Sequence, residues 1–160
     1  MSLATDSIFI AAIGSNPELM AKLGYITPEP GKTGKPARLY STAIPLPDED
    51  VDNVPVPYLI VTFDGLNNDL GTKDNLYESD YDKVNIGVEV VGKSLADLHQ
   101  LTQMVRDTIV GYFRENITRV EDYLMTADAI QFDSLKPCYW QVLRYQCDVC
   151  NIHEEDEQEG

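Results

Sequence analysis

The chain has 160 residues, 43% of them hydrophobic, which suits one core that buries roughly 70% of the surface of the unfolded chain. Its 12 lysines and arginines stand against 27 acidic residues, so the net charge is −15. This balance argues against a protein that grips nucleic-acid phosphates or an anionic membrane surface.

Part of the acidity lies at the end of the chain, where residues 153–160 hold five carboxylates and no apolar residue. Removing those five charges from −15 still leaves −10. We expect a single domain over residues 1–152 and a disordered acidic tail over residues 153–160. No stretch is apolar for the roughly 20 residues of a membrane span, and three cysteines fit a reducing cytoplasm better than a disulfide framework.

Two short helices are predicted between Thr5 and Gly24. Asn16 suits the N-cap of the second helix, Pro17 its first turn and Gly24 its end. The first helix is indicated by apolar residues at helical spacing, namely Ile8, Phe9, Ala12 and Ile13.

The region from Tyr25 to Pro57 holds seven of the nine prolines, a density that excludes a regular central strand. An edge strand fits within Ala37–Ile44, which lacks proline. Tyr58–Phe63 is apolar on both faces and predicts a central strand, ended by Asp64 and Gly65. Leu66–Asp80 is rich in Asn, Asp and Gly and is expected to be a mobile loop.

Tyr81–Val91 alternates clearly, with Val84, Ile86, Val88 and Val90 on one face, and predicts a strand. Ser94 is the expected N-cap of a long helix with Asp97 in its first turn. Its predicted apolar stripe comprises Leu95, Leu98, Leu101, Val105, Ile109, Tyr112 and Phe113.

Tyr139–Val149 alternates again, with Leu143, Tyr145, Cys147 and Val149 on one face, and predicts a half-buried last strand. The pattern of Val120–Asp133 is ambiguous. The predicted class is α+β: a mostly antiparallel sheet with one long helix and a short N-terminal helix pair packed on one face.

One cluster has the residue types of a zinc site, because Cys147, Cys150 and His153 follow a C-x-x-C-x-x-H spacing. In an extended strand Cys147 and Cys150 point to opposite faces, and no second ligand pair exists. Burial of Cys147 is therefore favoured over metal binding. His99 lies off the apolar stripe with no nucleophile beside it, so a solvated position is favoured over catalysis.

Two further patterns are interpreted as loops. Gly31–Lys35 resembles part of a phosphate-binding loop, but prolines flank it and no strand precedes it. Hard oxygen ligands for calcium are offered by Asp64, Asn67, Asn68, Asp69 and Asp74. Their spacing is not that of a known calcium loop. No tuned carboxylate pair or nucleophile motif is present, so neither an enzyme nor a cofactor is predicted.

The order of elements resembles the small tail-completion, or tail-terminator, proteins of long-tailed bacteriophages and prophages. The resemblance rests on the helix pair around Asn16–Leu19, the strand entered at Val56–Val61, the strand Val84–Val90 followed by Ser94–Leu98, and the strand Trp140–Tyr145. It covers roughly residues 5–151. The proline-rich segment and the acidic tail depart from the family.

This resemblance implies a virion structural protein without catalytic residues, assembled in the bacterial cytoplasm and located in the virion tail. Several copies, six in well-known members, would form a ring at the head-proximal end of the tail tube. The implied partners are further copies of this chain, the tail tube protein and head-tail connector proteins, with no specific nucleic-acid binding and no membrane. The loop proposed for assembly contacts contains Asn67, Asn68, Asp69, Lys73, Asp74 and Tyr77.

The competing hypothesis is a non-enzymatic α+β binding module of a host cytoplasm, for a small molecule or a metal. An acidic ring fits the first hypothesis physically, because six copies at −15 each carry −90 and would repel DNA passing through them.

We predict that the protein binds no stoichiometric metal, because its ligand cluster is divided between two strand faces. Elemental analysis of protein purified without chelator checks this. One zinc per chain would instead assign Cys147, Cys150 and His153 to a metal site.

Overall fold

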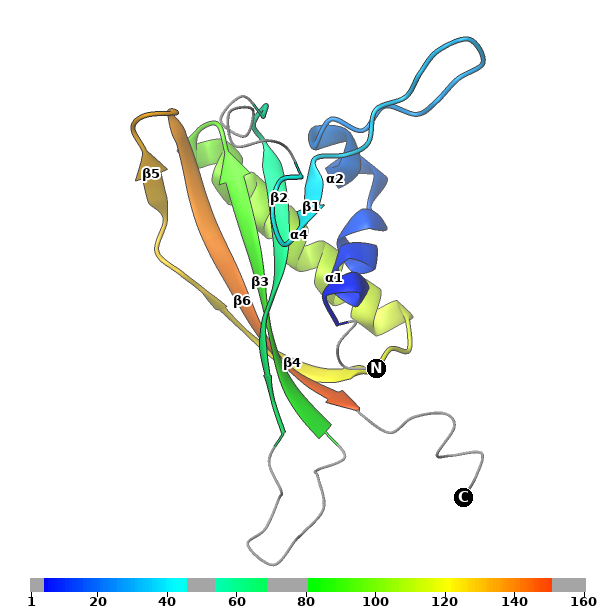
Figure 1. The fold of residues 1–160 in the computed structure, drawn as a ribbon, viewed down its shortest axis with the longest axis vertical. Helices are drawn as coiled ribbons and strands as arrows, with labels where there is room; N and C mark the ends of the chain where they lie inside the picture. The colour runs from blue at the N-terminus through cyan, green and yellow to red at the C-terminus, as the bar shows by residue number, and fades with distance from the viewer. Residues whose placement is uncertain (1–4, 46–53, 69–80, 151–160) are drawn as a thin grey trace, which may run out of the picture.

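The computed structural model describes residues 5–45, 54–68 and 81–150. Within these residues two helices come first, followed by three strands, one long helix and three further strands (Figure 1). Their bounds are α1 Thr5–Gly14, α2 Pro17–Lys22, β1 Leu39–Ser41, β2 Tyr58–Asn67, β3 Tyr81–Gly92, α4 Leu95–Glu115, β4 Val120–Ala127, β5 Gln131–Asp133 and β6 Cys138–Cys150.

The strands form one mixed sheet in the order β1-β2-β3-β6-β4, with β5 paired to the beginning of β6. β1 runs parallel to β2, and every other pairing is antiparallel. The predicted α+β class with a mostly antiparallel sheet is thus confirmed. β1 is short and lies at the edge, as the prolines around it require.

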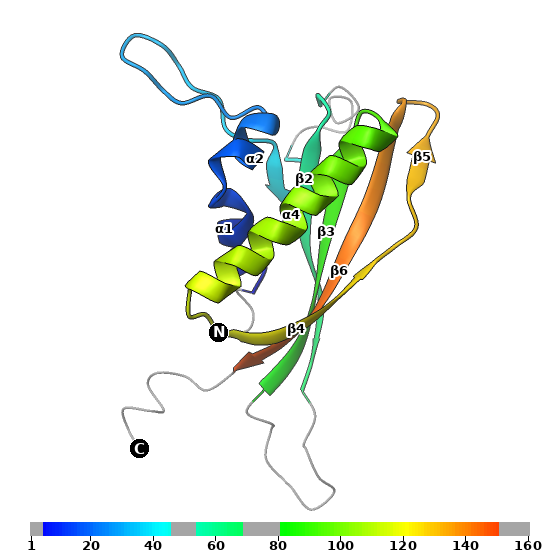
Figure 2. The same ribbon diagram turned by 180° about the vertical axis from the view of Figure 1, so that it is seen from behind.

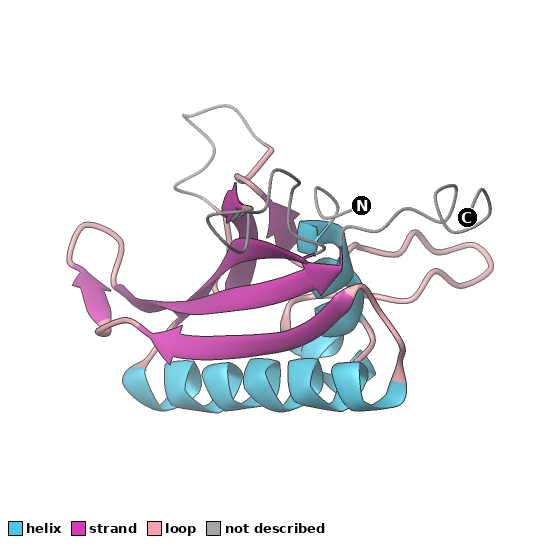
Figure 3. Cartoon of the chain, turned by 90° about the horizontal axis from the view of Figure 1, so that it is seen from below, coloured by secondary structure: helices cyan, strands magenta, loops and turns pink. Residues whose placement is uncertain are grey.

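The helices cover one face of the sheet. α4 lies across the central strands with α1 beside it, and Figures 2 and 3 show both on the same side. Alternation in β3 and β6 sends every second side chain to this side, so the register places aligned pairs such as Val88 and Leu143 beneath the helices. Phe9 of α1 fits between the rings of Phe113 and Tyr145.

The predicted helix caps are confirmed. The Asn16 side chain accepts hydrogen bonds from the Glu18 and Leu19 amides and donates one to Thr108 Oγ1 over 2.9 Å. One residue therefore begins α2 and fixes it to α4. The Ser94 side chain accepts from the Asp97 amide over 3.1 Å. The stripe of α4 begins at Leu98, whereas Leu95, predicted to belong to it, is 45% exposed.

Gly24 ends the helix pair with φ +88°, a conformation that favours glycine. A Cβ there would also collide with the guanidinium of Arg38. The Arg38 Nε donates to the Pro57 carbonyl over 3.0 Å, and its backbone bonds to both Leu23 and Leu59. Arg38 thereby joins the end of the helix pair to the beginnings of β1 and β2.

Two predicted boundaries are wrong. β2 does not end at Asp64 and Gly65: Asp64 is accommodated in a bulge, Gly65 takes φ +127°, and pairing with β3 resumes through Asn67. Leu66 and Asn67 thus belong to a strand and not to a loop. The undecided region Val120–Asp133 forms β4 and β5, which both pair with β6.

Leu143→Ala should destabilise the protein by about 2–5 kcal/mol, because Leu143 is 1% exposed in the middle of the core. Leu135→Ala is the matched control. Leu135 is 96% exposed, so its truncation should change the free energy of unfolding by less than about 0.5 kcal/mol. Urea unfolding measures both, and equal effects would contradict the assigned core.

Candidate assembly surfaces

The predicted assembly loop is described only at its first end. Asn67 closes β2 opposite Lys83. The Asn68 amide donates to Asp82 Oδ1 over 2.7 Å and to the Tyr81 carbonyl over 3.3 Å, which fixes it to the beginning of β3. The other predicted contact residues lie outside the described residues, namely Asp69, Lys73, Asp74 and Tyr77.

A polar belt crosses the sheet face that the helices leave uncovered. Thr62 Oγ1 donates to Asp64 Oδ1 over 2.8 Å, and both side chains lie over Gly87, where a Cβ would meet them. Arg144 on β6 approaches Asp64 Oδ2 to 3.8 Å and Asp128 Oδ2 to 2.8 Å. The charged side chains of this belt pair with one another. The belt divides the open face into two halves.

Beyond the belt, toward β5, the open face is largely apolar. Glu89 lies between Ile60 and Val142 in register, and Trp140 follows two pairs further along β6 on the same face. Burial raises the pKa of the Glu89 carboxyl above its ordinary value. Burial, followed by the charge of Glu89, raises the pKa of Tyr58 to about 12. A half-buried carboxylate among apolar side chains is unusual on a solvated surface. It is more typical of a face that another protein covers.

Loop residues contact the apolar half of the open sheet face. The Lys136 ammonium donates to the Val54 carbonyl over 2.6 Å and lies 5.7 Å from the centre of the Tyr58 ring. The Tyr58 ring in turn contacts Tyr40 of β1.

The zinc candidates are not brought together. Cys147 faces the core and Cys150 lies half-buried three residues on, on the opposite face, while His153 lies outside the described residues. Burial raises the pKa of the Cys147 thiol to about 12, which disfavours the thiolate that binds metal. Within residues 5–45, 54–68 and 81–150, no group of three or more His, Cys, Asp or Glu side chains could hold a metal ion.

The remaining predicted candidates lie apart from one another. His99 is exposed on α4. Of the proposed calcium ligands, Asp64 is engaged in the polar belt and Asn68 is bonded to β3, and Asp74 lies outside the described part. None of the helices in the described part is long and apolar enough to cross a membrane.

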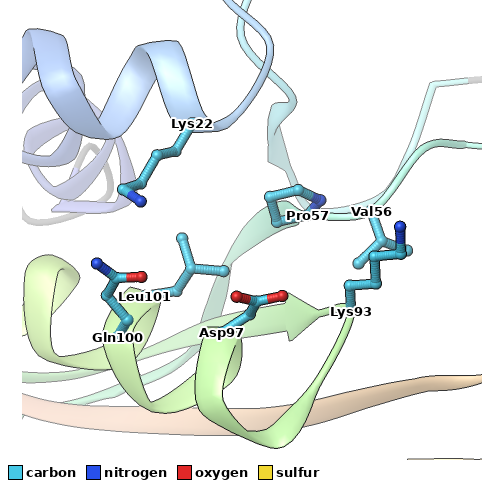
Figure 4. A pocket seen from close by; sticks show the side chains of 7 residues that line it. All are labelled: Lys22, Val56, Pro57, Lys93, Asp97, Gln100 and Leu101. Atoms are coloured by element: carbon cyan, nitrogen blue, oxygen red, sulfur yellow. The ribbon is translucent and has the colours of Figure 1, made fainter.

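A small cavity lies where α2 and α4 approach the entrance to β2 (Figure 4). Lys22 and Lys93 stand on opposite sides of it with Asp97 between them. Its volume of about 220 Å³ is below the 300–1,000 Å³ of typical small-molecule sites.

Sequence reasoning missed a projecting arm. Residues 26–35 double back as a narrow hairpin, closed at its base by paired backbone bonds between Ile26 and Lys35, and extend away from the body (Figure 1). Beside its base lies an apolar cleft of about 630 Å³. The succession of Pro28, Pro30 and the turn at Gly31 was the signal that could have indicated it.

Comparison with known proteins finds likenesses among solved structures. No protein-family model matches the chain, and a search of curated proteins returns no match. A chain of the solved structure "Virion of native gene transfer agent (GTA) particle" is similar, with a TM-score of 0.53 and 13% identity over 89% of this chain and 92% of that chain. At this identity the likeness shows a shared fold.

Glu89→Gln should stabilise the protein at neutral pH. Because the folded-state pKa of Glu89 lies above the unfolded one, the folded state holds this proton more tightly, and stability due to Glu89 falls as pH rises between the two values. The advantage of Glu89→Gln should therefore grow with pH across that window and vanish below it.

Urea unfolding at several pH values measures this trend, with Glu121→Gln on the exposed β4 position as a matched removal of one carboxylate. A Glu89→Gln advantage that does not depend on pH would contradict the desolvated position of the carboxyl.

Proposed function

We propose that the chain is a structural protein of a phage or phage-like virion. The observation that carries the proposal is the likeness to a chain of the gene transfer agent virion, which extends over nearly the whole of both chains. The described residues support a role in assembly, because their most notable surface features are an open sheet face, a projecting arm and exposed apolar turns.

Within that class we propose a tail terminator. Six copies form a ring at the head-proximal end of the tail tube, stop its growth and offer a docking face to the head. The partners are other copies, the tail tube protein and head-tail connector proteins, and the ring assembles in the bacterial cytoplasm and remains in the virion tail. The order of helix pair, strands and long helix supports this role.

Electrostatics also supports the role. A net charge of −15 per copy surrounds passing DNA with like charge, so the ring neither grips phosphates nor slows them. We assign contacts with tail or head to the loop containing Asn67, Asn68, Asp69, Lys73, Asp74 and Tyr77, because it connects β2 and β3 in the sequence and connecting loops commonly carry partner contacts.

Deletion of the gene from its prophage should give tails of uncontrolled length that fail to join heads, because nothing caps the tube. Electron microscopy of the induced particles measures tail length and head attachment, and restoring the gene on a plasmid is the control. Normal, infectious particles from the deletion strain would refute the proposal.

A further inference from the structure

Two exposed apolar features lie at opposite edges of the sheet and at the same end of the molecule. The arm and its cleft are beside β1, whereas the turn between β5 and β6 is at the far edge, and Figures 1 and 2 show both at the top. Figure 3 shows the same separation from below. A ring needs this arrangement, because each copy must present two different surfaces to its two neighbours.

The first of the two features is the cleft beside the arm. One wall comes from the ends of α1 and α2, and the other from the base of the arm and the approach to β1. Both walls are mainly apolar, with Met20 on the helix side and Leu39 on the strand side. Its volume of about 630 Å³ lies in the range of clefts that enclose a compact ligand.

The second feature is the turn between β5 and β6 at the other edge. Leu135 is 96% exposed at its tip, and Phe132 is 55% exposed just before it. The turn is held in shape, because Asp133 Oδ1 accepts from the Leu135 amide over 3.0 Å and from the Lys136 amide over 3.4 Å. A large apolar side chain held outward by a fixed turn loses little further freedom on docking.

Charge favours the same pairing. The arm carries Lys32 and Lys35 against Glu29 alone, so it is a positive projection on a protein of net charge −15. Val120–Leu135, which forms the opposite edge, holds four carboxylates and no basic residue, and three of the four remain once Asp128 is paired with Arg144. The arm of one copy is therefore attracted to the β4 and β5 edge of another.

We propose that the Leu135 turn of one copy enters the cleft at the base of the arm of the next copy, so that copies join head to tail. The arm then lies along the acidic β4 and β5 edge of the neighbour. This inference deepens the proposed ring function and rests on it for the identity of the assembly.

Photocrosslinking tests the contact directly. Benzoylphenylalanine replaces Leu135, and a mixture of ¹⁵N-labelled and unlabelled protein is irradiated. The protein concentration is about 1 mM, which matches the effective concentration of sites joined by a short flexible linker. Mass spectrometry should find mixed-isotope products joined to the segment 14–39. The same group in place of Ile117 is the control, since Ile117 is fully exposed before β4, at the opposite end of β6 from the turn.

The Ile117 position should give at least tenfold less product in segment 14–39. Products from position 135 at another surface, or none between copies, overturn the inference.

Leu135→Asp gives a second measurement. It should reduce self-association in sedimentation at least tenfold with an unchanged unfolding midpoint, whereas Ile117→Asp should leave association intact. Equal association of wild type and Leu135→Asp overturns the contact.

Complementation of the deletion strain separates this failure from that of the proposed function. If wild type and Leu135→Asp both restore capped tails, the contact is wrong and the function stands. If the deletion itself leaves tails normal, the proposed function fails, and crosslinking alone decides the contact.

Discussion

Burial of one sheet face under α4 and α1 is the constraint on which the rest of the molecule depends. In β3 and β6 the side-chain alternation must send the Val88 and Leu143 pair toward the helices, so a shift of one residue would expose the core. The register changes once along β2, at the bulge at Asp64. One extra residue is left unpaired there, and Leu66 returns to register with Val84.

The opposite face is free of that constraint, and this freedom leaves surfaces for assembly. Arg144 collects Asp64 and Asp128 into a paired belt, and the half beyond it keeps a half-buried Glu89 among apolar neighbours. A monomer that exposes Leu135 and the projecting arm gains nothing for its own stability from either. Such features are explained more readily by contacts outside the chain than by folding.

Three residues connect the helix pair to the rest of the fold, namely Gly24, Arg38 and Asn16. Arg38 closes over Gly24 and reaches the entrance of β2, so the base of the arm is fixed to the sheet through one side chain. Asn16 fixes the helix pair to α4. The cleft between arm and helices is therefore held in shape where the base of the arm is fixed to the body, which suits a surface that must meet a neighbour at a defined angle.

The sequence by itself determined the elements whose signals are local: the caps at Asn16 and Ser94, the alternation of β3 and β6, and the helix stripe from Leu98 to Ile109. It also predicted that Cys147 and Cys150 point to opposite faces of the last strand. Tertiary structure alone decided that Val120–Asp133 becomes two strands, because β6 supplies the pairing that no local pattern encodes. It likewise decided that the arm and the Leu135 turn lie at opposite edges, since their separation follows from strand order, and strand order is fixed by long-range pairing.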